Sequence, residues 1–235
     1  HKLAASAASG LARQVDAVLD QLAIERAVLC GVSFGGLVAL RYAATRPGRT
    51  AGLILASTPG PGFRLRPRHE VYARRPWLFG PVFLAEMPGR VGQEIAAALP
   101  GPLERLRFTR RQVWTFVRAP LSLSGMAARA RLLAGAQEGE RRRQEAAEVD
   151  TPTLVLTGDS RLDHVVPPEG TSEYVGLING ARAVRIERSG HLGCITRPLA
   201  FAEAIVDFMR SSGLTDLTGR GLIRSAADRS RDDAA

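Results

Sequence analysis

The chain has 235 residues, of which 45% are hydrophobic and 23% are charged, as is typical of a soluble globular protein with one large domain. No apolar run approaches the ~18 residues that a membrane-spanning helix needs, so we expect no membrane partner. The formal charge of +9 comes almost entirely from arginine without interleaved aromatic residues, which argues against a nucleic-acid partner.

The N-terminal residues and the cysteines favour a cytoplasmic location. The first ten residues lack the charged start, apolar middle and cleavage site of a signal peptide. Cys30 and Cys194 are too few for a disulfide framework, and we expect both to be buried as small hydrophobic residues. No clustered spacing of His and Cys indicates a metal site, and we expect no cofactor.

The first quarter of the chain alternates between helix and strand patterns. Apolar residues recur at helical spacing over 9–25, and the short apolar run 27–30 predicts a buried parallel strand. A second helix is expected over 34–45, where a Pro-Gly pair ends it, and a second buried strand over 51–56. This order predicts the α/β class, with a mostly parallel sheet and flanking helices.

Residues 61–149 break the alternation. The segment is rich in Arg and Ala, is interrupted by prolines and contains no convincing strand. We therefore expect several short helices that form a cap, inserted between two parts of the core at 1–60 and 150–210. Five aromatic residues are expected to pack inside this cap, and contact with substrate is the alternative: Trp77, Phe79, Phe83, Trp114 and Phe116.

The parallel pattern resumes after the insertion. Strands are expected over 153–157 and 183–187, each followed by a loop and a helix, at 168–178 and 198–209 respectively. The remainder, 211–235, is polar without a sustained pattern, which predicts a disordered tail.

A nucleophilic serine is predicted at Ser33. The run Gly31-Val32-Ser33-Phe34-Gly35 matches G-x-S-x-G directly after a strand and before a helix. Glycines two residues on either side remove Cβ atoms that would clash in the strained turn, and the N–H of Phe34 points at a developing oxyanion. The pattern alone is weak, and a serine that only caps the helix is the alternative. An acid and a histidine further along the chain, in that order, would favour the nucleophile.

A base and an acid follow in the required order. His191, in the loop after the last strand, is the only one of the four histidines placed to take the proton of Ser33, although a loop histidine without a role is the alternative. Two carboxylates, Asp159 and Asp163, follow strand 153–157, and either could orient the imidazole.

With these residues the chain resembles the α/β-hydrolase superfamily over residues 10–210. The acid of that superfamily commonly stands in a D-x-x-V-P-like sequence, which 163–167 matches, so the resemblance favours Asp163. The turn before it is about two residues longer than usual, which keeps Asp159 as the alternative.

The resemblance implies a serine hydrolase that cleaves an ester or similar acyl bond through an acyl-enzyme. The apolar residues of the cap suggest a small or medium, largely apolar acyl or alcohol group in the substrate. The alternatives are an acyltransferase or C–C bond hydrolase with the same triad, and a non-catalytic member that binds a ligand.

The resemblance also implies further strands before strand 27–30, here named the elbow strand because it leads into the sharp turn at Ser33. In the superfamily such strands are present, and a loop that often contains His-Gly supplies the second oxyanion donor. Here only about 26 residues precede strand 27–30, and they contain no His-Gly. We therefore expect the elbow strand to lie at a sheet edge, and expect the chain to be a truncated or misassigned form of a longer enzyme.

Overall fold

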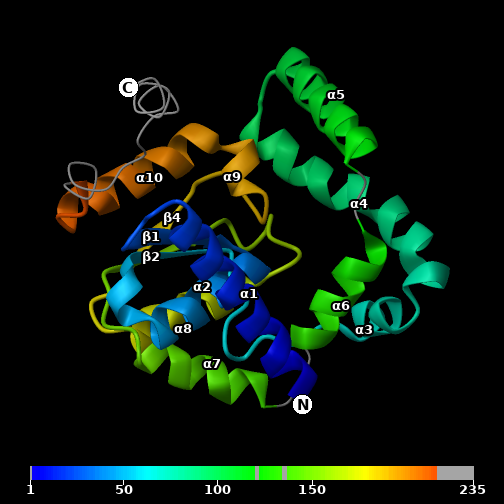
Figure 1. The fold of residues 1–235 in the computed structure, drawn as a ribbon. Helices are drawn as coiled ribbons and strands as arrows, with labels where there is room; N and C mark the ends of the chain where they lie inside the picture. The colour runs from blue at the N-terminus through cyan, green and yellow to red at the C-terminus, as the bar shows by residue number, and fades with distance from the viewer. Residues whose placement is uncertain (1, 120–121, 134–136, 216–235) are drawn as a thin grey trace, which may run out of the picture.

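One parallel sheet organises the computed structural model, which describes residues 2–119, 122–133 and 137–215 (Figure 1). Its four strands stand in chain order, and every neighbouring pair is parallel. The strands are β1 (Ala27–Val32), β2 (Thr50–Ala56), β3 (Thr153–Thr157) and β4 (Arg182–Arg185). The arrangement confirms the predicted α/β class, and β1 continues to Val32 rather than ending at residue 30.

Helices cover both faces of the sheet (Figure 1). Their bounds are α1 (Lys2–Gln21), α2 (Phe34–Thr45), α7 (Glu138–Ala147), α8 (Pro168–Leu177), α9 (Gly193–Thr196) and α10 (Pro198–Ser211), with a 3₁₀ turn at Pro47–Arg49. On one face α2 and α8 contact the strands, and α1 and α7 pack against α2. On the other face lie α9 and α10. None of the described helices is long and apolar enough to cross a membrane.

Successive side chains of β2 enter two different apolar cores, as the period of two in a central strand requires. Leu53 and Leu55 pack in the cluster that contains Tyr174 of α8. Ile54 packs on the opposite face, in the cluster that contains Phe208 of α10. Because apolar side chains pack on both faces of the sheet, the C-terminal ends of the strands are held in place, and the loops that follow them start from fixed positions.

The strand before Ser33 lies at the edge of the sheet, as the sequence predicts. Within the described residues β1 pairs with β2 alone. Cys30 of this strand is exposed and Cys194 is half-buried. The expectation that both cysteines are buried is therefore wrong for Cys30, because an edge strand has a neighbour on one side only.

Between β2 and α7 the described residues form four helices, here named the helical insertion, which stand away from the sheet (Figure 1). They are α3 (Pro67–Arg74), α4 (Pro76–Ala98), α5 (Pro102–Arg118) and α6 (Leu123–Leu133). The sequence predicts only short helices here, but α4 continues through Pro81 and Pro88. Each proline removes one backbone N–H donor, and the hydrogen bonds of the other residues keep α4 helical through both positions.

The aromatic residues of the insertion divide into a packed and an exposed group. Phe79 stacks on Tyr72 at 5.7 Å between ring centroids, and Phe83 meets the same ring edge-on at 6.4 Å. Trp77 and Trp114 are 78% and 57% exposed, so the expectation that they pack inside the insertion is wrong. Aromatic content does not reveal which face of a helix meets a neighbour. The side chain of Phe116 lies outside the described part.

The start of the predicted disordered tail is folded. Leu214 is buried in the cluster that contains Phe208. Its side chain lies so close to β2 that a Cβ on Gly52 would be 2.8 Å from it. Residues 216–235, the remainder of the predicted tail, lie outside the described residues.

Candidate active site

Ser33 lies on the sharp turn between β1 and α2. Its backbone has φ 54° and ψ −124°, a strained conformation for a residue with a Cβ atom. The Ser33 N–H donates to the carbonyl of Ala56 at 2.8 Å, which ties the turn to the end of β2. Among the described residues, the Ser33 hydroxyl makes no hydrogen bond that caps α2, so the alternative interpretation as a helix cap is wrong.

Close packing at the turn requires glycine at two positions. A Cβ on Gly31 would lie 2.4 Å from the Cα of Gly36, and a Cβ on Gly36 would lie 1.9 Å from Oγ1 of Thr58. A Cβ on Gly35 would have no described neighbour within 4 Å. The clash predicted at Gly31 is present, whereas the one predicted at Gly35 is wrong and occurs one residue later. The glycine doublet is the sequence signal that could have identified it.

The structure brings Ser33, His191 and Asp163 together beyond the C-terminal ends of β1, β4 and β3. Nε2 of His191 lies 3.1 Å from Oγ of Ser33, and Nδ1 lies 3.3 Å from Oδ2 of Asp163. The side chains of His191 and Asp163 are 15% and 1% exposed. The carboxylate of Asp163 is therefore shielded from water, while part of the imidazole of His191 remains accessible.

The carboxylate of Asp163 is held by the backbone of its own loop. Oδ1 accepts hydrogen bonds from the N–H groups of Val165 and Val166 at 3.0 and 2.8 Å. The N–H of Asp163 donates to the carbonyl of Asp159 at 3.0 Å, which closes the turn. These contacts leave Oδ2 directed at His191.

Asp159 faces a different partner. Its carboxylate accepts hydrogen bonds from the guanidinium of Arg161 at 3.0 Å and from the Arg161 backbone N–H at 2.9 Å. The hydrogen bonds from the Arg161 side chain hold the pKa of Asp159 at about 2, below its usual range. Within the described residues the structure pairs Asp159 with Arg161 and Asp163 with His191.

Phe34 is the first residue of α2, so its N–H has no acceptor within the helix. This donor and the positive end of the helix dipole lie at the Ser33 turn, where they favour negative charge. A pocket with both apolar and charged lining residues, from α2, α6 and α7, includes Phe34 in its wall. The lining residues are Phe34, Leu37, Val38, Arg41, Leu132, Leu133, Glu138, Arg142 and Glu145.

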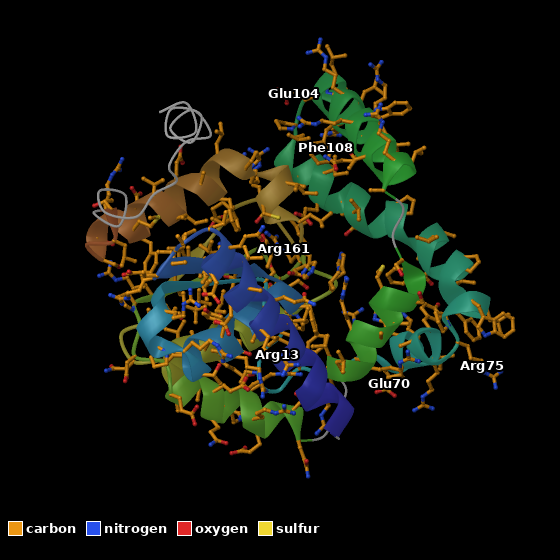
Figure 2. The ribbon with its side chains drawn as sticks, in the orientation of Figure 1. Arg13, Glu70, Arg75, Glu104, Phe108 and Arg161 are labelled. Carbon is orange, nitrogen blue, oxygen red and sulfur yellow. The ribbon has the colours of Figure 1, made fainter. Side chains whose placement is uncertain are left out.

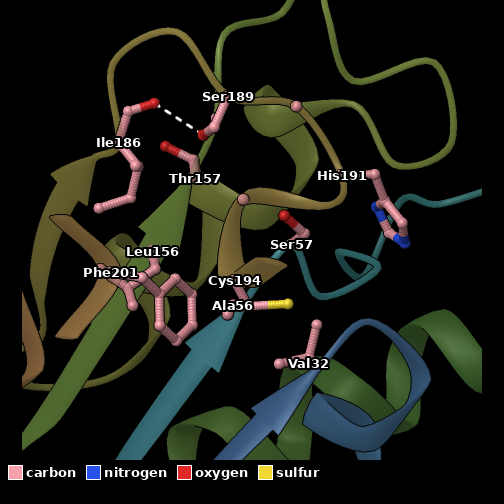
Figure 3. Close-up of a pocket in the computed structure, with 13 residues that line it drawn as sticks. Val32, Ala56, Ser57, Leu156, Thr157, Ile186, Ser189, His191, Cys194 and Phe201 are labelled. Atoms are coloured by element: carbon pink, nitrogen blue, oxygen red, sulfur yellow. Dashed lines mark hydrogen bonds between the residues drawn. The ribbon is translucent and has the colours of Figure 1, made fainter. Parts of the chain in front are cut away.

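A smaller pocket lies beside His191 (Figure 3). Phe201 and Cys194 form part of its apolar wall. Ser189 is buried and donates its hydroxyl to the carbonyl of Ile186 at 2.8 Å, which holds the start of the loop that carries His191. In the described part of the chain, no group of three or more His, Cys, Asp or Glu side chains is arranged to hold a metal ion.

Solved structures share this fold. An esterase from Exiguobacterium antarcticum matches with a TM-score of 0.66 and 23% identity, over 85% of this chain and 72% of that one. Est816, an N-acyl homoserine lactone degrading enzyme, matches with a TM-score of 0.62 and 24% identity, over 84% of this chain and 73% of that one. At these identities the likeness shows the fold alone.

Sequence comparison identifies the family. The AB hydrolase superfamily protein YisY of Bacillus subtilis (strain 168) is 29% identical over 183 residues, which are 77% of this chain and 65% of that protein. The chain thus spans less than two thirds of the length of this relative. The model of the alpha/beta hydrolase fold family matches residues 7–198. The chain therefore belongs to the alpha/beta hydrolase fold family.

Proposed function

We propose that the protein is a serine hydrolase that cleaves an ester or similar acyl bond, with Ser33 as nucleophile, His191 as base and Asp163 as acid. One observation carries the proposal: Nε2 of His191 is 3.1 Å from Oγ of Ser33 while its Nδ1 faces Asp163. A hydroxyl, an imidazole and a buried carboxylate in this order can make a serine nucleophilic at neutral pH.

The proposed reaction has two halves. As Oγ of Ser33 attacks the carbonyl carbon, Nε2 of His191 takes the hydroxyl proton, and the N–H of Phe34 donates to the oxyanion. The protonated Nε2 then gives its proton to the departing alcohol, which leaves an acyl-enzyme on Ser33. Water then attacks this ester while Nε2 of His191 takes one of its protons. The bond between the acyl carbon and Oγ of Ser33 breaks, Nε2 returns the proton to Oγ, and the carboxylic acid is released. Asp163 holds Nδ1–H throughout and stabilises the imidazolium.

The pocket beside Phe34 supports an apolar acyl group as part of the substrate. Its apolar lining residues come from α2 and α6 and include Phe34, whose N–H would bind the oxyanion, so we propose that an acyl chain reaches this pocket. α6 belongs to the helical insertion, which we propose acts as a cap over the site.

Covalent labelling tests the proposal. A fluorophosphonate probe should label the wild-type protein and should not label Ser33→Ala. Ser57→Ala is a matched control, because Ser57 lines the pocket beside His191 but has no part in the proposed reaction. Folded wild-type protein that resists the probe and does not hydrolyse p-nitrophenyl butyrate would contradict a serine hydrolase. Transfer of the acyl group to added alcohols in preference to water would indicate an acyltransferase.

A series of acyl chains tests the substrate class. If the pocket beside Phe34 takes the acyl group, kcat/KM for p-nitrophenyl esters should rise from acetate to hexanoate. Val38→Trp should fill the pocket and remove that rise while preserving acetate hydrolysis. An unchanged chain-length profile in Val38→Trp would place the acyl group elsewhere.

A further inference from the structure

A buried carboxylate from the helical insertion contacts the loop that carries His191. Glu94 of α4 is 2% exposed. Its Oε1 accepts a hydrogen bond from the hydroxyl of Thr196 at 2.8 Å, and both of its oxygens lie 3.1 Å from the N–H of Leu192. A charged group is stable at such depth only when donors satisfy it, and the two donors that the described residues provide, the Leu192 N–H and the Thr196 hydroxyl, lie within the five residues that follow His191.

The carboxylate also packs against the residue on the other side of His191. A Cβ on Gly190 would lie 2.8 Å from Oε2 of Glu94 and 2.5 Å from the carbonyl oxygen of Leu162. Only glycine therefore lets this loop lie between Glu94 and the loop that ends in Asp163. Glu94 thus meets the chain immediately before and immediately after the proposed base.

The same stretch of α4 holds both loops of the proposed triad. Gln93 Oε1 lies 3.1 Å from Nε2 of His164, the residue after Asp163. Arg188, three residues before His191, donates its Nε–H to the carbonyl of Ala97 at 2.7 Å. The loop of the base and the loop of the acid are therefore both fastened to one segment of the insertion, residues 93–97.

We propose that Glu94 is a positioning residue for His191. Through Glu94, the position of α4 and of the helical insertion then affects whether the triad has its reactive geometry. The inference rests on the proposed function, because it assigns Glu94 a role in that reaction. By fixing the Leu192 N–H and the Thr196 hydroxyl, Glu94 keeps Nε2 of His191 facing Ser33. A shift of about 1 Å at a reacting group can cost on the order of 10²-fold in rate, so such a brace affects kcat.

Substitution of Glu94 tests the inference. Glu94→Ala should lower kcat by about 10²-fold and slow fluorophosphonate labelling of Ser33 to a similar degree, with KM within about twofold of wild type. Glu94→Gln keeps an acceptor at Oε1 and should retain more activity than Glu94→Ala. Glu104→Gln is the matched control on the exposed surface of α5 (Figure 2) and should leave both measurements unchanged.

Thr196→Val approaches the same contact from the other side. It removes one hydrogen-bond donor to Glu94 without changing the insertion, and should lower kcat about three- to tenfold. Because both substitutions act on one contact, the loss in Thr196→Val/Glu94→Gln should be smaller than the product of the two single losses. The Thr196→Val variant still tests the inference if Glu94→Ala does not fold.

The outcomes separate the inference from the function on which it rests. Absence of labelling and hydrolysis in the folded wild type overturns the proposed function and the inference with it. An active wild type, together with folded Glu94→Gln and Thr196→Val variants that keep the wild-type kcat and labelling rate, overturns the inference alone. A fall in stability of these variants without a fall in kcat shows that the contact only stabilises the fold, and this result also overturns the inference.

Discussion

Oδ1 of Asp163 accepts the N–H of Val166 at 2.8 Å, and this bond decides what the other carboxylate oxygen can do. The N–H of Val165 binds the same oxygen at 3.0 Å. A side chain anchored in this way cannot rotate without losing both donors. Oδ2 therefore remains opposite Nδ1 of His191, where it can stabilise a proton on that nitrogen.

Asp163→Asn should lower kcat/KM by about 10⁴-fold. To satisfy the N–H groups of Val165 and Val166, the amide oxygen must occupy the Oδ1 position, so the NH₂ group faces Nδ1 of His191. Neutral His191 must then carry its proton on Nε2, the nitrogen that should accept the proton of Ser33. Steady-state hydrolysis of p-nitrophenyl butyrate measures the loss.

Asp159→Asn is the comparison for that experiment, because it makes the same chemical change in the same loop. Since its carboxylate binds Arg161, we expect kcat/KM within about threefold of wild type. The reverse result, a large loss with Asp159→Asn and a small one with Asp163→Asn, would transfer the role of the acid to Asp159.

The glycines at 35 and 36 should respond differently to alanine. Gly35→Ala should be tolerated and could raise stability by up to ~1 kcal/mol, because alanine favours the helix and the new methyl group meets no described neighbour within 4 Å. Gly36→Ala places a methyl group against buried Thr58 and should cost about 1–3 kcal/mol. Urea unfolding followed by circular dichroism measures both.

A second substitution shows whether steric conflict causes the loss in Gly36→Ala. Thr58→Ala removes Oγ1 and Cγ2, the two atoms that would lie 1.9 and 2.7 Å from the new Cβ, and should restore part of the stability in the double variant. Equal stability of Gly35→Ala and Gly36→Ala would show that the turn does not require close approach at residue 36.

The hydrogen bonds between Asp159 and Arg161 should make stability depend on pH. Because they hold the pKa of Asp159 at about 2, below its ordinary 3.8, they stabilise the folded state above pH ~4, and this contribution is lost as pH falls toward 2. Asp159→Asn should be less stable than wild type between pH 5 and 7. The difference should shrink between about pH 4 and 2. Arg161→Gln should give the same profile, and a difference that does not change with pH would contradict this assignment.

The sequence predicts the parts of this protein that depend on local order. The strand, sharp turn and helix around Ser33 follow from hydrophobic runs and glycine spacing, and His191 follows from its place after the last strand. The choice between Asp159 and Asp163 depends on how hydrogen bonds fold the loop that contains both. The residue pattern alone does not reveal that loop conformation, so it does not decide between the two carboxylates. Glu94 lies 98 residues from Leu192, and no periodic pattern links them, so only the folded chain reveals their contact.

The same limit applies to Tyr42 of α2, because no pattern in the sequence reveals the partner of its hydroxyl. Tyr42 is fully buried, and its hydroxyl donates to Asp16 of α1 at 2.7 Å, while Nε of Arg46 lies 2.5 Å from the other oxygen. Burial and this bond raise the pKa of Tyr42 to about 12.

Tyr42→Phe should cost about 1.5–3 kcal/mol of unfolding free energy, since it removes a donor from the Asp16 carboxylate that links α1 to α2. Urea unfolding at pH 7 measures the cost, and Thr115→Val, which removes an exposed hydroxyl that donates to a backbone carbonyl of α5, is the control. A Tyr42→Phe variant as stable as wild type would show that Arg46 and Arg49 alone satisfy Asp16.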